Sequence, residues 1–282
     1  MCTLILGRDV LAPDSVLLAA NRDEDPARPS DPPRLLLYSP RLVGGRDRRA
    51  GGTWLAVREG RAVVALLNRP DRAAAAPPAA ERPSRGLLVL EVAGVAEDYA
   101  VQLDPVGERQ EMLERLRAVS GPGLPYAALC RAFAALWVAS IAPCTLLFAA
   151  PEACWLMAVD ADAPPRFEQV PAGWHVITHA DLDDLGEPRT ARLIRELSRF
   201  APRSVEQAEQ RLGDLLRSHG DDAAGIPPVC LHEGRMVTVS ASSVWLTAGG
   251  ARYRHAEGRP CEHPLADLSH LLRAPESTEE RR

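Results

Sequence analysis

Residues 1–24 read MCTLILGRDVLAPDSVLLAANRDE and contain two apolar runs, each long enough for a β-strand. The runs Thr3–Leu6 and Ser15–Ala20 are separated by Gly, Asp and Pro residues, which favour turns. The second run leads directly into four polar residues, Asn21–Glu24. This pattern predicts an antiparallel pair of strands that carries polar side chains at one end.

The rest of the chain continues in groups of strands and groups of helices. Glu59-Gly60 lies between two strand-length runs and predicts a tight hairpin turn. Further strands are expected at 35–38, 54–58, 61–67, 145–149, 154–159, 174–178, 229–232, 236–240, 243–248 and 251–255. Helices are expected at 85–93, 108–119, 125–141, 187–200 and 204–219, the last opening with a capping box at 204–207. Such grouping favours an α+β architecture with two sheets over a doubly wound nucleotide-binding fold.

The composition excludes several kinds of chemistry. All 33 basic residues are Arg, so Schiff-base chemistry and a P-loop lysine are excluded. A net charge of −5 provides no basic surface for nucleic acid. No secretory signal pattern opens the chain, and the uncharged stretch 132–151 contains Ser, Thr and Pro, which argue against a membrane span. We therefore expect a cytoplasmic protein that neither binds nucleic acid nor spans a membrane.

Cys2 is the most informative single residue. If Met1 is removed, the thiol and a free α-amine belong to one residue, and an α-amine of pKa about 7.7–8.0 can act as general base for its own side chain. Such a nucleophile needs no histidine partner. A buried strand cysteine without catalytic function is the alternative interpretation.

Short motifs of polar residues and glycine accompany the predicted strands. The glycine pairs among them are interpreted as turn glycines, because a phosphate-binding loop needs a following helix. The motifs are Met1-Cys2, Asn21-Arg22-Asp23-Glu24, Gly44-Gly45-Arg46-Asp47, Ala50-Gly51-Gly52-Thr53-Trp54-Leu55, Asn68-Arg69 and Ser84-Arg85-Gly86. In order and spacing, over about the first third of the chain, they resemble the NRDE family, also called the transport and Golgi organisation protein 2 family.

The resemblance implies a fold and a set of site residues. The fold is a four-layer αββα sandwich of the N-terminal-nucleophile-hydrolase type, in one domain over residues 1–273 with a polar tail at 274–282. By analogy with the choloylglycine-type amidases of that fold, Cys2 would be the nucleophile, Asp23 would orient its amine, and Asn68 would donate to the oxyanion. The side chains expected to bind substrate are those of Asn21, Arg22, Arg46, Thr53 and Trp54.

Two functions follow from the resemblance. The first is a cysteine amidohydrolase that acts on a small amide or acyl substrate, which the Met1-Cys2 start and the polar tetrad favour. The second is a non-catalytic carrier or chaperone for a hydrophobic metabolite, because haem trafficking and lipid or acyl-CoA homeostasis have been attributed to family members. Haem would then be a carried ligand and not a cofactor. Ala241 and Leu67 replace an Arg and a Thr that are common in the family, and the change at Ala241 favours the carrier.

Structural roles compete with the functional ones at several of these positions. Arg22 and Asp23 can pair with Arg46 or Asp47 to join two loops. Trp54 can serve as core packing with its indole N–H satisfied locally.

Two Cys-x-His pairs, Cys230-Leu231-His232 and Cys261-Glu262-His263, look like half-sites for zinc. A single residue separates the two ligands of each pair, and the sequence offers no evident closing partner. No metal site is predicted on this basis.

Overall fold

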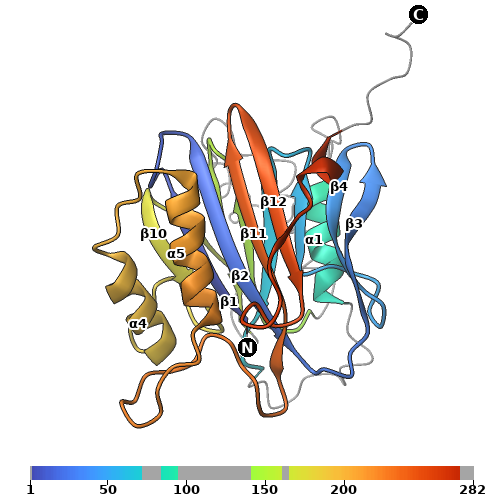
Figure 1. Cartoon of the computed structure of the whole chain (residues 1–282). Helices are drawn as coiled ribbons and strands as arrows, with labels where there is room; N and C mark the ends of the chain where they lie inside the picture. The colour runs from blue at the N-terminus through green and yellow to red at the C-terminus, as the bar shows by residue number, and fades with distance from the viewer. Residues whose placement is uncertain (1, 72–83, 95–140, 161–164, 274–282) are drawn as a thin grey trace, which may run out of the picture.

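The structure is a computed structural model that describes residues 2–71, 84–94, 141–160 and 165–273. The helix expected at 108–119, the helix expected at 125–141 except for Ile141, and the tail at 274–282 lie outside these residues. Within the described residues, two antiparallel sheets dominate the fold (Figure 1).

The first sheet contains the opening strands of the chain at its centre. Its order is β10-β1-β2-β11-β12-β13. The bounds are β10 Gly173–Ile177, β1 Thr3–Arg8, β2 Ser15–Glu24, β11 Val237–Thr247, β12 Gly250–Glu257 and β13 Ala266–Asp267. In this register Thr3 lies opposite Asn21, so the residue before β1 reaches the polar end of β2. The predicted pairing of the first two strands is confirmed.

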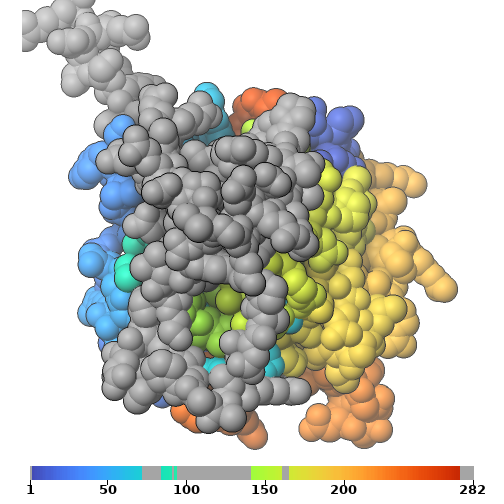
Figure 2. All heavy atoms as spheres, turned by 180° about the vertical axis from the view of Figure 1, so that it is seen from behind, coloured from blue at the N-terminus to red at the C-terminus, as the bar shows by residue number. Residues whose placement is uncertain are grey.

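The second sheet runs in strict chain order, β3-β4-β5-β6-β7-β8-β9. Its bounds are β3 Ser30–Tyr38, β4 Arg41–Asp47, β5 Leu55–Arg58, β6 Ala62–Asn68, β7 Cys144–Ala149, β8 Cys154–Val159 and β9 Arg166–Gln169. Glu59 and Gly60 both have positive φ and close the β5–β6 hairpin, as predicted. Seen from the opposite side, the yellow-green segment that contains β7 and β8 lies beside the yellow segment that follows it in the chain (Figure 2).

Helices cover the outer face of each sheet. On the first sheet, α4 (Pro188–Leu197) and α5 (Val205–Arg217) bury an apolar stripe against Leu17 and Ala19 of β2. On the second sheet, α1 (Arg85–Gly94) buries Leu88 and Val92. A short 3-10 helix, η2, spans Ser269–Leu272 near the end of the described chain. The predicted α+β class and αββα layering are therefore confirmed.

Besides the apolar clusters under the helices, a further apolar cluster fills the space between the two sheets. Leu4, Leu18 and Val244 contribute to it from the first sheet, and Leu67 and Leu147 contribute from the second. The central strands are covered on both faces, and so β1 and β2 appear in the sequence as nearly continuous apolar runs. Neighbouring residues on these strands point to different layers, which decides which side chains reach the site described below.

The capping of α5 follows the sequence pattern. Ser204 accepts a hydrogen bond from the Gln207 backbone N–H at 3.2 Å, and the Gln207 side chain accepts one from the Arg203 N–H at 2.7 Å. Among the described residues, no helix combines the length and apolarity needed to cross a membrane.

Two expectations about local structure are wrong. Gly44-Gly45 lies inside β4 and is not a turn. A Cβ on Gly45 would come within 2.4 Å of the Trp54 ring, and one on Gly44 would come within 2.4 Å of the Leu55 carbonyl oxygen. The glycines therefore allow close packing within the strand.

The strand expected at 229–232 is also absent from the described chain. The backbone N–H groups of Val229 and Cys230 both donate to the Ser218 carbonyl oxygen, and the N–H of Leu231 donates to the Thr238 hydroxyl. These bonds replace a strand ladder with a loop held against the end of α5 and the start of β11. The runs expected at 236–240 and 243–248 form the single strand β11, which is irregular between Thr238 and Ser240.

Candidate functional site

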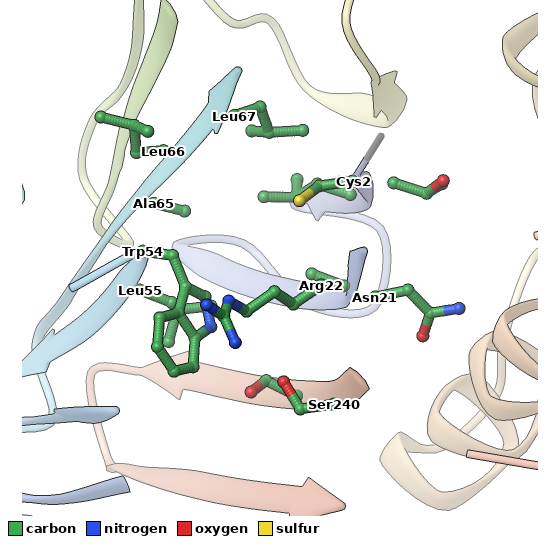
Figure 3. Close-up of a pocket in the computed structure, with 13 residues that line it drawn as sticks. Cys2, Asn21, Arg22, Trp54, Leu55, Ala65, Leu66, Leu67 and Ser240 are labelled. Carbon is green, nitrogen blue, oxygen red and sulfur yellow. The ribbon is translucent and has the colours of Figure 1, made fainter. Parts of the chain in front are cut away.

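Cys2 immediately precedes β1 and directs its thiol into a pocket between the two sheets (Figure 3). The residue is partly exposed, and its Sγ lies 3.8 Å from the backbone carbonyl oxygen of Asp23. Burial of the sulfur and the nearby Asp23 charge raise the pKa of the Cys2 thiol. The thiol is therefore protonated at neutral pH and needs a base before it can act as a nucleophile.

The pocket is mainly apolar and holds about 340 Å³ of empty space, part of it open to solvent. Its polar side chains are those of Cys2, Thr3, Asn21, Arg22, Ser240 and Ser242, together with the indole of Trp54. The remaining lining residues are Leu4, Ala20, Leu55, Ala65, Leu66 and Leu67. An apolar chamber with a few polar groups is typical of a small-molecule site.

Arg22 and Trp54 lie together along one wall of the pocket (Figure 3). The Arg22 guanidinium carbon is 4.0 Å from the centre of the indole ring, which is cation–π distance. One guanidinium nitrogen donates to the Ser30 hydroxyl at 3.1 Å, and another lies 3.9 Å from the Glu24 carboxylate. Both residues were predicted to bind substrate, and the structure places both in the pocket wall.

Asp23 follows Arg22 on β2 and therefore faces the helical layer, away from the pocket. Its Oδ1 accepts a 2.7 Å hydrogen bond from the Thr238 hydroxyl, and its Oδ2 lies 3.9 Å from Arg189 of α4. Burial raises the pKa of the Asp23 carboxyl to about 6, although Thr238 and Arg189 both act to lower it. Arg189 also donates to the Thr3 hydroxyl at 2.8 Å, which ties α4 to the first residue of β1.

The predicted pairing of Arg22 or Asp23 with Arg46 or Asp47 is replaced by other partners. Arg22 has Glu24 as its carboxylate partner, and Asp23 has the hydroxyl of Thr238 and the guanidinium of Arg189. Asp47 pairs with Arg28 at 2.7 Å. The contact between these two loops is therefore made by Arg28 and Asp47.

Asn21 has a structural environment. Its amide nitrogen donates to the carbonyl oxygens of Leu216 at 2.9 Å and Val229 at 3.0 Å. Its side chain is directed away from Cys2 and towards the helices (Figure 3). The residue touches the pocket, but its amide N–H groups hold the end of α5 and the following loop against β2.

Three further predicted site residues lie away from the pocket. Asn68 is exposed at the end of β6, where the preceding Leu67 occupies the pocket-facing position. Arg46 is exposed on β4. Thr53 is buried, with its hydroxyl donating to the Leu55 carbonyl and its N–H donating to the Gly86 carbonyl at the start of α1. Strand alternation explains Asn68, because the neighbour of a pocket-facing residue on a strand points to the other face.

Ser240 and Ser242 are pocket residues that the sequence analysis did not select. Ser240 has a buried hydroxyl oxygen with no hydrogen-bond partner among the described residues. The Ser242 hydroxyl bonds to His255 Nδ1 at 2.9 Å, and burial lowers the pKa of that histidine to about 4. The two serines are two residues apart on a strand, so their side chains lie on the same face of the sheet. This spacing could have identified them from the sequence. Ala241 between them packs against the helical layer, so the family difference at this position lies outside the pocket.

Known proteins provide distant structural matches and one family match. No curated protein matches the sequence. A solved mutant of conjugated bile acid hydrolase from Clostridium perfringens is 11% identical with a TM-score of 0.49, and the match covers 98% of this chain and 95% of that one. A Caenorhabditis elegans ortholog of N-acylethanolamine-hydrolyzing acid amidase is 12% identical with a TM-score of 0.46, covering 86% and 92%. The family model described as Transport and Golgi organisation 2 matches residues 1–224, and the chain therefore belongs to that family.

Proposed function

We propose that the protein, after removal of Met1, is an N-terminal cysteine amidohydrolase that cleaves a small amide with an apolar acyl group. The observation that carries the proposal is the position of the Cys2 thiol. It belongs to the second residue of the chain and lies in a pocket that combines apolar walls with Arg22, Ser240 and Ser242.

The protonated thiol supports a mechanism in which the α-amine of Cys2 is the base. The amine takes the thiol proton, and the thiolate adds to the substrate carbonyl carbon. The tetrahedral intermediate then breaks its C–N bond, and the leaving amine takes the proton from the α-ammonium group. Water hydrolyses the resulting thioester with the α-amine as base, and the proton returns to the sulfur. The products are a carboxylic acid and an amine.

Asp23 supports this cycle through its charge. With a pKa of about 6 the carboxyl is largely ionised at neutral pH, and its negative charge would stabilise the ammonium group that forms when the α-amine takes the thiol proton. Thr238 and Arg189 hold the carboxylate in place. Asp23 therefore acts as a positioning residue for the amine.

The oxyanion needs a donor inside the pocket, and Asn68 is not there. The Ser240 hydroxyl is buried and lacks a hydrogen-bond partner among the described residues, so it has a proton to donate. A single preorganised donor of this kind contributes about 3–4 kcal/mol of transition-state stabilisation in other hydrolases. We assign this role to Ser240.

The pocket favours a short acyl group. Its roughly 340 Å³ of empty space includes a part that is open to solvent, so the enclosed part is smaller. A few methylene groups would fill the enclosed part. Hydrophobic burial in it would contribute about 0.8 kcal/mol per methylene group.

A carrier is the second candidate, and Leu67 is the observation that favours it. Leu67 lines the pocket where a threonine is common in the family, so the pocket has gained an apolar group and lacks that hydroxyl. A carrier would bind a short acyl compound or a haem-like ligand without cleaving it.

Turnover of fluorogenic N-acyl aminocoumarins with acyl chains of increasing length tests the proposal. We expect the wild type to release the dye, with a preference for short chains, and Cys2→Ala to release none while its melting temperature stays within a few degrees. Cys154→Ala, which removes a buried thiol outside the pocket, is the matched control and should retain turnover. Saturable binding without release, unchanged in Cys2→Ala, would establish the carrier instead.

A further inference from the structure

Four metal-ligating side chains converge at one end of the first sheet, and none of them lines the Cys2 pocket. His219 follows α5, Cys230 and His232 lie on the loop before β11, and Cys261 follows β12. One ligand atom from each of the four lies within 4.8 Å of the others. The cluster uses both cysteines of the Cys-x-His pairs but only one of the histidines, because His219 takes the place that the sequence suggested for His263.

The spacing of the four groups matches a tetrahedral zinc site. Zn–S bonds of about 2.3 Å and Zn–N bonds of about 2.0–2.1 Å place two sulfurs about 3.8 Å apart and a sulfur and a nitrogen about 3.5 Å apart. The two Sγ atoms are 3.5 Å apart. His232 Nε2 lies 3.2 Å from the Cys261 sulfur and 3.9 Å from the Cys230 sulfur. The rings of His219 and His232 meet edge to face with centroids 4.7 Å apart.

The orientation of His232 gives independent support. Its Nε2 faces the two sulfurs, and its Nδ1 lies 3.7 Å from the Glu262 carboxylate. A carboxylate next to the far ring nitrogen is the usual second contact of a zinc-bound histidine. Glu262 is held in turn by Arg259, which also donates to the His232 carbonyl oxygen.

We propose that His219, Cys230, His232 and Cys261 form a structural site for one zinc ion. Two thiolates and two neutral imidazoles balance the charge of Zn²⁺, and four protein ligands leave no open position for catalysis. The site joins the end of α5, the loop before β11 and the segment after β12.

The site also supports the polar end of β2. Next to Cys230, the Val229 carbonyl accepts from Asn21, and the Leu231 N–H donates to Thr238. Thr238 donates in turn to Asp23. Bound zinc would therefore fix the loop that holds Asn21 and Asp23 in place. This structural role does not depend on which reaction takes place at Cys2.

Metal analysis of the purified full-length protein tests the proposal. We expect about one zinc ion per chain, retained in His263→Ala and lost from Cys261→Ser. Glu262→Gln should weaken zinc binding by about 10–100-fold without abolishing it. His263 is the matched control because it belongs to a Cys-x-His pair but lies outside the cluster.

A second measurement uses the wild type and remains decisive if a variant fails to fold. After removal of metal under reducing conditions, added Co²⁺ should give thiolate-to-cobalt charge-transfer absorption, and added Zn²⁺ should raise the melting temperature. A Cys230–Cys261 disulfide in the freshly isolated protein, or reduced protein that takes up neither metal, would overturn the proposal.

Discussion

Replacement of Asp23 by Asn changes the charge of the most strongly perturbed carboxyl in the site while keeping its shape and its acceptor for Thr238. The carboxyl binds its proton more tightly in the folded chain, where its pKa is about 6, than at the ordinary value of 3.8. Between these two pH values the folded state holds more protons than the unfolded state. The free energy of unfolding must therefore fall as the pH rises through this window.

The magnitude follows from the size of the shift. A difference of about two pKa units corresponds to about 3 kcal/mol, lost between pH about 4 and about 6. Asp23→Asn carries no such charge and should be about 3 kcal/mol more stable than the wild type above pH about 7. For a chain of this size that difference is roughly 6–12 °C in melting temperature. At pH about 4 the two proteins should be nearly equal in stability.

Urea unfolding at several pH values measures this effect directly. Asp181→Asn is a suitable control, because hydrogen bonds from Arg166 and Arg69 lower the pKa of Asp181 and the sign is reversed. That variant should lose stability above pH about 4. Wild-type and Asp23→Asn curves that stay parallel from pH about 4 to about 7 would refute the conclusion that the buried charge of Asp23 opposes folding. Turnover should be lost in Asp23→Asn even though the fold is more stable, since the α-amine would lack its carboxylate.

Three other predictions concern the chain near the pocket. The intact mass of the expressed protein should lack Met1, and a retained methionine would remove the proposed base. Iodoacetamide should label Cys2 faster than Cys154, because the Cys2 side chain is partly exposed whereas Cys154 is fully buried; equal rates, followed by peptide mass spectrometry, would contradict this. Gly45→Ala should destabilise the protein by about 1–3 kcal/mol in thermal unfolding, because the new methyl group meets the Trp54 ring, and an unchanged melting temperature would show that the ring can move freely.

The layers of the fold could be predicted from the sequence because the strands are covered on both faces. Burial of both faces turns β1, β2 and β6 into nearly continuous apolar runs, which are easy to recognise. The strand β4 was missed because Gly44 and Gly45 are usually turn residues. Their role here depends on Trp54 and Leu55, which approach from the neighbouring chain segment, and this contact is invisible to a local pattern.

The candidate site was harder to predict from the sequence than the fold was, for two physical reasons. A motif names consecutive residues, but a strand sends consecutive side chains to opposite faces, so Leu67 reaches the pocket and Asn68 does not. For the cluster around Cys230, the sequence named Cys230, His232 and Cys261 but not His219. His219 and Cys261 come from segments on either side of Cys230 in the chain, and only the packing of α5 and β12 on one sheet brings them together.

The alternation of faces also limits how the Cys2 thiol can be activated. The thiol faces the space between the sheets, whereas the Asp23 carboxylate faces the helical layer with Thr238 and Arg189. A carboxylate on the far face of the sheet is badly placed to take the thiol proton itself. Removal of Met1 would free an α-amine on the same residue as the thiol, directly before the start of β1. If the proposed reaction occurs, it must therefore depend on removal of Met1. Asp23→Asn must then lower turnover through its effect on the α-amine, and it must leave the access of alkylating reagents to Cys2 unchanged.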